Sequence, residues 1–224
     1  MIEAVRALYR PVRNYFVAAP ATLVYLFSLL VNWVTLRGAD QRVTHRLIVS
    51  ASTNLDNMRK EPLQVLIASA FWSDSTAFPW LLILEFLVVL AAAERALGTR
   101  RAIAIFAAGH VGATLITVTG IAYAVKHEMI PERIARTSDV GTSYGFFAVT
   151  AAFVSTMPKV PRVVLSAGLV IYLVIAAWRG QGFTDYGHLA ALAIGFSAYP
   201  VGRLAVRLFR RRSTEAVHTV EAVG

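Results

Sequence analysis

The chain carries long apolar runs, and their length restricts its fold more than any other feature. A helix needs about 20 mostly apolar residues to cross a bilayer. The runs that approach this length are Tyr15–Leu36, Phe78–Ala93, Ala102–Val125, Gly141–Met157, Val163–Trp178 and His188–Leu208. Charged residues make up only 16% of the 224 residues, whereas a soluble domain has about a quarter. The sequence therefore predicts an all-α, polytopic membrane protein with six transmembrane helices.

Basic residues gather at the ends of alternate runs and indicate the direction of each helix. They precede the first run and follow the second, fourth and sixth (Arg6, Arg10, Arg13, Arg95, Arg100, Arg101, Lys159, Arg162, Arg203, Arg207, Arg210, Arg211 and Arg212). Segments rich in Lys and Arg stay on the cytoplasmic side. We therefore expect a multi-pass protein of the plasma (cell inner) membrane with both termini in the cytoplasm. The net charge of +9 then reflects topology and contacts with the lipid bilayer, and no nucleic-acid partner is expected.

The segment between the first two runs, residues 37–77, is predicted to be a long outer loop. Its stretch PLQVLIASAFW is apolar for only about ten residues, which is too short to cross, so we expect it at the outer interface. The stretch RVTHRL around His45 is expected to be solvated loop. We expect one transmembrane domain over residues 1–212 and a short disordered cytoplasmic tail over 213–224.

A serine and a histidine open two of the predicted helices at the same depth. Ser143 lies in DVGTSYG at the start of the fourth run, and His188 lies in GHLAALAIGF at the start of the sixth. A serine hydroxyl is a weak nucleophile unless a base takes its proton, and imidazole titrates near neutral pH. Taken singly, the serine could bond its own helix backbone and the histidine could lie at the interface. Taken together, Ser143 and His188 predict a catalytic dyad.

Small residues near this pair predict that the two helices approach closely. Ala191 and Gly195 follow His188 at three and seven residues, and Gly141 and Gly145 flank Ser143. Small side chains let helix backbones come together within a membrane. We expect Phe147, one turn after Ser143, to pack on the imidazole.

These features resemble the rhomboid family of intramembrane serine proteases over about residues 62–200. The resemblance is carried by Gly141–Thr142–Ser143, by His188 with Ala191 and Gly195, by the long first outer loop and by Glu94–Arg95–Ala96–Leu97–Gly98. It implies a six-helix rhomboid-like bundle with Ser143 as nucleophile, His188 as base and Phe147 stacked on the base. The substrates would be membrane-anchored proteins cut near the outer face, and no metal, ATP or organic cofactor is implied.

Two departures from that family's pattern leave a second function open. Family members usually have glycine directly after the serine, where this chain has Tyr144. They also commonly carry His-x-x-x-Asn at the outer end of the second span, where this chain reads FPWLL (Phe78–Leu82). Loss of one oxyanion donor can lower the rate about 100- to 1000-fold. The alternative is a rhomboid-like pseudoprotease that binds transmembrane client proteins without cutting them.

Two further ionisable residues, Glu85 and His110, fall inside predicted spans. Such groups are costly in lipid and are usually paired, and both stand at a similar height above the turn at Glu94–Thr99. We therefore expect Glu85 and His110 to form an intramembrane pair. The pair is either structural or part of a polar cavity, or His110 supplies an oxyanion donor together with Thr114 one turn on.

Two other acidic residues have simpler expected roles. Asp185, three residues before His188, either orients the imidazole as a third member of a triad or caps the sixth helix. Glu94, with Arg95, is expected to tie the cytoplasmic turn after the second span.

Overall fold

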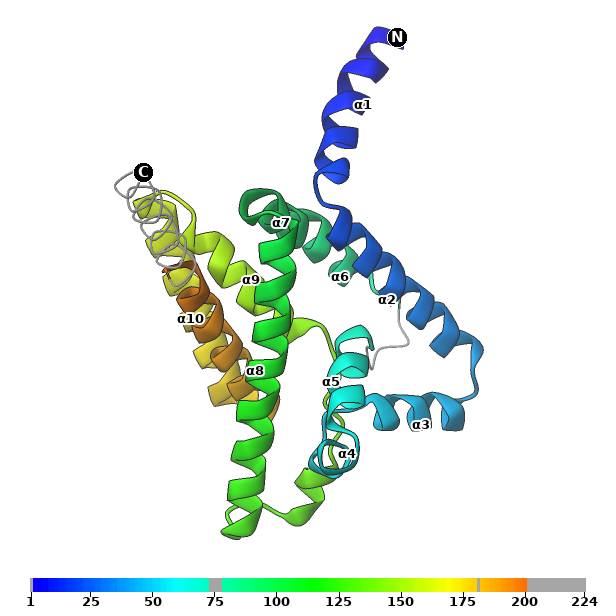
Figure 1. Cartoon of the computed structure of the whole chain (residues 1–224), viewed down its shortest axis with the longest axis vertical. Coiled ribbons are helices and arrows are strands. Elements are labelled where there is room, and N and C mark those ends of the chain that lie inside the picture. Colours follow the sequence, from blue (N-terminus) through cyan, green and yellow to red (C-terminus); the bar gives the residue numbers. More distant parts are fainter. Residues whose placement is uncertain (1, 73–77, 181, 201–224) are drawn as a thin grey trace, which may run out of the picture.

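The structure is a computed structural model that describes residues 2–72, 78–180 and 182–200, with side chains described from residue 10 onward. All regular structure in this part of the chain is helical (Figure 1). The α-helices are α1 (Ile2–Val17), α2 (Pro20–Gly38), α3 (Gln41–Ala51), α4 (Leu55–Lys60), α5 (Pro62–Phe71), α6 (Trp80–Glu85), α7 (Ala91–Leu97), α8 (Thr99–Lys126), α9 (Ser143–Ser155) and α10 (Lys159–Gly180). The expected tail, and the end of the sixth apolar run, lie outside the described residues.

Three further helical segments complete this description. A π-helical turn, Phe86–Leu90, joins α6 to α7, so residues 80–97 form one helix with a local widening. A 3₁₀ turn, Glu132–Arg136, lies between α8 and α9. Residues 183–200 are also helical and are called helix 183–200 below.

Within the described residues, α2, α8 and α10 are long and apolar enough to cross a bilayer. They correspond to the first, third and fifth predicted runs. The first run is divided, however, because α1 ends at Val17 and α2 begins at Pro20. Proline is favoured at the start of a helix and interrupts one that precedes it, so Tyr15 belongs to α1. The apolar helices α5 and α9 are shorter, at 10 and 13 residues.

The predicted outer loop contains helices, and the expectation of solvated loop around His45 was wrong. RVTHRL belongs to α3, which begins after Asp40. The Asp40 carboxylate accepts hydrogen bonds from the backbone N–H groups of Arg42 and Val43 at 2.7 and 3.0 Å, a typical helix N-cap. The helix buries Thr44 and Ala51 and exposes its basic side chains. Its amphipathic face, together with this cap, explains why the segment is ordered.

The core between α2 and helix 80–97 is closed by a buried carboxylate. Glu94 is 1% exposed and accepts hydrogen bonds from the N–H groups of Ala21 and Thr22 and from the hydroxyls of Thr22 and Thr99, at 2.7–3.0 Å. The first N–H groups of a helix have no partner within it, so Glu94 serves as the cap of α2. Arg95 instead lies over the ring of Tyr15 in α1, with its guanidinium carbon 4.5 Å from the ring centroid. The turn is thus tied to both N-terminal helices.

Three helices meet at Ala148, near the centre of the bundle. Ala148 is completely buried in α9. A Cβ placed on Gly109 of α8 would overlap the Ala148 side chain, and one placed on Gly195 would overlap the Ala148 backbone carbonyl. Small residues at these three positions therefore bring α8, α9 and helix 183–200 into direct contact.

Candidate active site

The structure brings the side chains of Ser143 and His188 together. Ser143 is the first residue of α9, and His188 lies in the second turn of helix 183–200. The Ser143 Oγ is 2.8 Å from the His188 Nε2, within the distance required between a nucleophile and its general base. Both side chains are partly buried. A neutral imidazole with its proton on Nδ1 would accept the Ser143 hydroxyl proton at Nε2.

Two aromatic rings contact the imidazole of His188. The Phe147 ring lies 4.9 Å from the imidazole, centroid to centroid, at an interplanar angle of 54°. The Tyr144 ring lies 5.4 Å away at 72°, in an edge-on arrangement. Phe147 therefore occupies the place expected for it, and Tyr144 is a second contact that the sequence analysis did not assign.

The small residues expected at this helix contact do not all serve it. Gly195 faces α9 at Ala148, and Ala191 is completely buried beside Tyr144. The expectation for Gly145 was wrong, because a Cβ there would overlap the ring of Phe106 in α8. Gly145 follows Ser143 by two residues, or about 200° around the helix, so it points away from helix 183–200.

Gly141 also differs from its expected role, because it precedes α9 and so cannot thin the surface of that helix. Its φ is +143°, a backbone conformation that favours glycine. Its N–H donates to the backbone carbonyl of Ser69 in α5 at 3.0 Å. Gly141 therefore fixes the turn that delivers Ser143 to the start of α9.

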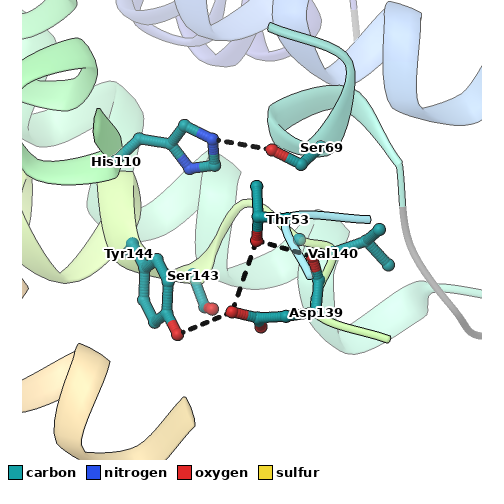
Figure 2. A pocket seen from close by; sticks show the side chains of 8 residues that line it. Thr53, Ser69, His110, Asp139, Val140, Ser143 and Tyr144 are labelled. Atoms are coloured by element: carbon teal, nitrogen blue, oxygen red, sulfur yellow. Dashed lines mark hydrogen bonds between the residues drawn. The ribbon is translucent and has the colours of Figure 1, made fainter. Parts of the chain in front are cut away.

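A small polar pocket opens beside Ser143 (Figure 2). Its volume is about 10 Å³, which is enough for about one water molecule. Its lining comes from α5, α8, α9 and two connecting segments: Thr53, Ser69, His110, Asp139, Val140, Gly141, Ser143 and Tyr144. Thr53 and Ser69 were not found from the sequence, since nothing local marks a hydroxyl residue that reaches a site some 75 to 90 positions further along the chain.

Asp139 is a buried carboxyl residue in the segment that precedes α9. It is 9% exposed and accepts hydrogen bonds from the hydroxyls of Tyr144, Thr184 and Thr53 at 3.0, 3.4 and 3.5 Å. Burial raises the pKa of the Asp139 carboxyl above its usual value, and these three hydrogen bonds act in the opposite direction. Among the described residues, Asp139 has no ion-pair partner.

The structure does not bring Glu85 and His110 together. Glu85 is exposed on α6, whereas His110 is 4% exposed and its Nε2 lies 3.1 Å from the Ser69 Oγ and 3.0 Å from the Leu66 carbonyl oxygen. The described residues contain no Glu85–His110 ion pair. The two residues face different ways because equal height on neighbouring helices does not fix the direction of a side chain.

The hydrogen bond with Leu66 also decides what His110 can offer the site. A carbonyl oxygen only accepts, so the Nε2 carries the proton and the Nδ1 of the neutral ring is an acceptor. Among the described residues, neither that Nδ1 nor the hydroxyl of Thr114 has a hydrogen-bond partner. An oxyanion needs donors, so neutral His110 does not fit that role, although Thr114 retains a free hydroxyl.

Asp185 is not the cap of its helix, and the described structure shows no hydrogen bond that would make it a third member of a triad. Helix 183–200 begins two residues before it, and its N–H donates to the Gly182 carbonyl at 3.1 Å. It therefore lies inside the first turn rather than at the cap. No hydrogen bond joins its carboxylate to His188 among the residues described.

The arrangement can support nucleophilic attack at Ser143 with proton transfer to His188. The start of α9 adds backbone N–H groups without partners within the helix, which can stabilise negative charge next to the serine. The described part of the chain contains no cluster of three or more His, Cys, Asp or Glu suited to a metal.

Comparisons with known proteins identify the family but not the reaction. The family model described as "Rhomboid-like protein" matches residues 14–207. The searches among curated proteins and among solved structures gave no match. The matched segment covers most of the chain and includes both Ser143 and His188. This protein is therefore a membrane protein that belongs to the rhomboid-like family.

Proposed function

We propose that the protein is an intramembrane serine endopeptidase that cleaves membrane-anchored proteins near the outer face. The observation that carries this proposal is the 2.8 Å distance from the Ser143 Oγ to the His188 Nε2. The Ser143 oxygen attacks the carbonyl carbon of the scissile peptide bond while its proton passes to the Nε2 of His188. The protonated imidazole then donates that proton to the leaving amine, and water releases the acyl group with His188 as base.

The proposed topology has six crossings, made by α2, the helix of residues 80–97, α8, α9, α10 and helix 183–200. In this topology both termini are cytoplasmic, and α3 to α5 form a loop on the outer side. The membrane is the plasma membrane. The 13 residues of α9 extend about 20 Å, whereas the hydrocarbon core is about 30 Å thick. If α9 ends at the cytoplasmic surface, Ser143 lies about 10 Å below the outer one. A substrate helix must then unwind locally to present its peptide bond.

The topology can be tested directly because the chain has no cysteine. Lys60 in the outer loop and Arg101 at the start of α8 are both exposed. We expect Lys60→Cys to react with a membrane-impermeant maleimide on intact cells, and Arg101→Cys to react only after permeabilisation. The reverse pattern would contradict the proposed orientation.

The peptidase proposal is tested with a reconstituted single-span model substrate. Ser143→Ala should abolish cleavage because no other group replaces the hydroxyl. Ser155→Ala is the matched control, since Ser155 ends the same helix and its hydroxyl donates to the Ala151 carbonyl at 2.9 Å. Equal cleavage by Ser143→Ala and the wild type would end the proposal.

The second candidate is a pseudoprotease that binds transmembrane clients. It is favoured by Tyr144 after the serine, by FPWLL in place of the usual His-x-x-x-Asn, and by the acceptor character of His110. A fluorophosphonate probe separates the two functions, because it reacts only with an activated serine. Labelling of the wild type, but not of Ser143→Ala, supports the peptidase; absence of labelling together with retained client binding supports the pseudoprotease.

A further inference from the structure

The carboxylate of Asp139 accepts hydrogen bonds from three separate segments. Figure 2 shows the bonds from Tyr144 and Thr53. Thr53 lies between α3 and α4, Tyr144 belongs to α9, and Thr184 lies in the first turn of helix 183–200. A buried carboxylate without a cation is unfavourable unless hydrogen bonds replace its hydration. Here those hydrogen bonds come from hydroxyl groups, and the shortest of the three is donated by Tyr144.

The backbone of Asp139 is held as firmly as its side chain. Its N–H donates to the Ser52 Oγ at 2.6 Å, and its carbonyl accepts from the N–H and the hydroxyl of Thr53, each at 2.9 Å. The carboxylate therefore has a fixed position relative to the outer loop. A group bonded to it is positioned by that loop as well.

Tyr144 transmits this position to the imidazole of His188. Its side chain is 4% exposed, and its ring lies 5.4 Å from the imidazole. A Cβ on Gly187 would overlap the Tyr144 ring and its hydroxyl oxygen. The residue before His188 thus leaves room for this ring, so the tyrosine that replaces the usual glycine fits a complementary space.

We propose that Tyr144 and Asp139 form a positioning pair that fixes the orientation of the His188 ring toward Ser143. The hydrogen bond to Asp139 holds the tyrosine ring beside the imidazole, and Phe147 supplies a second ring contact. Neither Tyr144 nor Asp139 contacts the reacting atoms in this role. The inference rests on the proposed function, because it assigns a role in activating Ser143.

The test measures the rate of fluorophosphonate labelling of Ser143 in the full-length protein. Tyr144→Phe keeps the ring and removes only the hydroxyl, and we expect labelling to slow about tenfold, the order expected for one hydrogen bond to a charged group. Tyr172→Phe is the matched control, because Tyr172 is 62% exposed on α10, and its rate should equal that of the wild type. An unchanged rate in Tyr144→Phe would overturn the inference.

Variants of Asp139 separate positioning from a general loss of structure. Asp139→Asn retains an oxygen that accepts from the Tyr144 hydroxyl, so it should keep most of the rate, whereas Asp139→Val should behave like Tyr144→Phe. The double variant Tyr144→Phe/Asp139→Val should be no slower than either single variant, because both remove the same interaction. Fully additive losses would contradict a shared role. If Asp139→Val does not fold, Tyr144→Phe and Asp139→Asn decide the question.

A second measurement distinguishes failure of this inference from failure of the proposed function. If wild-type Ser143 is not labelled, the peptidase proposal fails, and the ¹⁵N resonances of the His188 ring decide the positioning role. A change in these resonances in Tyr144→Phe, but not in Tyr172→Phe, supports the pair. Identical resonances in all three proteins overturn it.

Discussion

The buried carboxylate of Glu94 provides the sharpest test of what holds the bundle together. Each of its oxygens accepts two donors: Oε2 accepts the N–H and the hydroxyl of Thr22, and Oε1 accepts the N–H of Ala21 and the hydroxyl of Thr99. Glu94→Gln preserves the shape of the side chain but turns one oxygen into an NH₂ group. Whichever way the amide turns, this group faces one backbone N–H of α2.

The expected loss of stability follows from these four hydrogen bonds to Glu94. A hydroxyl can rotate to accept from the new NH₂ group, but a backbone N–H cannot. The variant therefore loses at least one hydrogen bond to a charged group, worth about 1.5–3 kcal/mol. It also loses the negative charge at the N-terminus of α2, worth about 0.3–1 kcal/mol. We expect the free energy of unfolding to fall by about 3 kcal/mol.

The assay is unfolding in mixed micelles with a rising fraction of sodium dodecyl sulfate, followed by tryptophan fluorescence. Glu85→Gln is the matched control, since Glu85 lies on the same helix of residues 80–97 but is exposed. It should unfold at the same detergent fraction as the wild type. If Glu94→Gln unfolded with the control, the carboxylate would not be the cap that its contacts indicate.

Further predictions concern backbone contacts and pH. Gly195→Ala should lower stability by about 1–3 kcal/mol, because its Cβ would overlap the Ala148 carbonyl; Gly168→Ala, where the space is open, should not destabilise the protein, and thermal unfolding in detergent compares them. Gly141→Ala should slow fluorophosphonate labelling, because its φ of +143° strains a residue with a side chain; labelling at the wild-type rate would refute this. Burial raises the pKa of Asp139, so the folded state binds its proton more tightly than the unfolded state. The free energy of unfolding should then fall as pH rises from about 4 through that raised pKa, relative to Asp139→Asn, and parallel curves would contradict this.

Helices that the sequence predicted well are those decided by apolar length alone. The bounds of α8 and α10 lie within a few residues of the third and fifth runs, because a long apolar segment has few other stable states in a membrane. The proximity of Ser143 and His188 could also be predicted from the sequence. It depends only on two helices that run in the same direction and carry these residues in their first or second turn.

What the sequence did not predict depends on directions around a helix and on contacts between distant segments. Gly145 was assigned to the wrong neighbouring helix, because residues two positions apart in a helix point about 200° away from each other. Glu85 was paired with His110 by height alone, without regard to the direction of its side chain. α3 was missed because its apolar face is short. The hydrogen bonds of Asp139 with Thr53 and Thr184 join residues 86 and 45 positions away, and no local pattern marks such partners.

The contact of three helices at Ala148 has a consequence for how the site responds to change. Below the dyad, the separation of α9 and helix 183–200 is set where Gly195 meets the backbone of Ala148. A contact between backbone atoms cannot relax by a change of side-chain rotamer. Side chains elsewhere in the bundle can change rotamer when temperature or lipid thickness varies. The contact at Ala148 cannot, so it keeps the helices at a fixed separation. A larger side chain at any of its three small positions would displace a whole helix. The arrangement of Ser143 and His188 should therefore be either retained or lost, without intermediate arrangements.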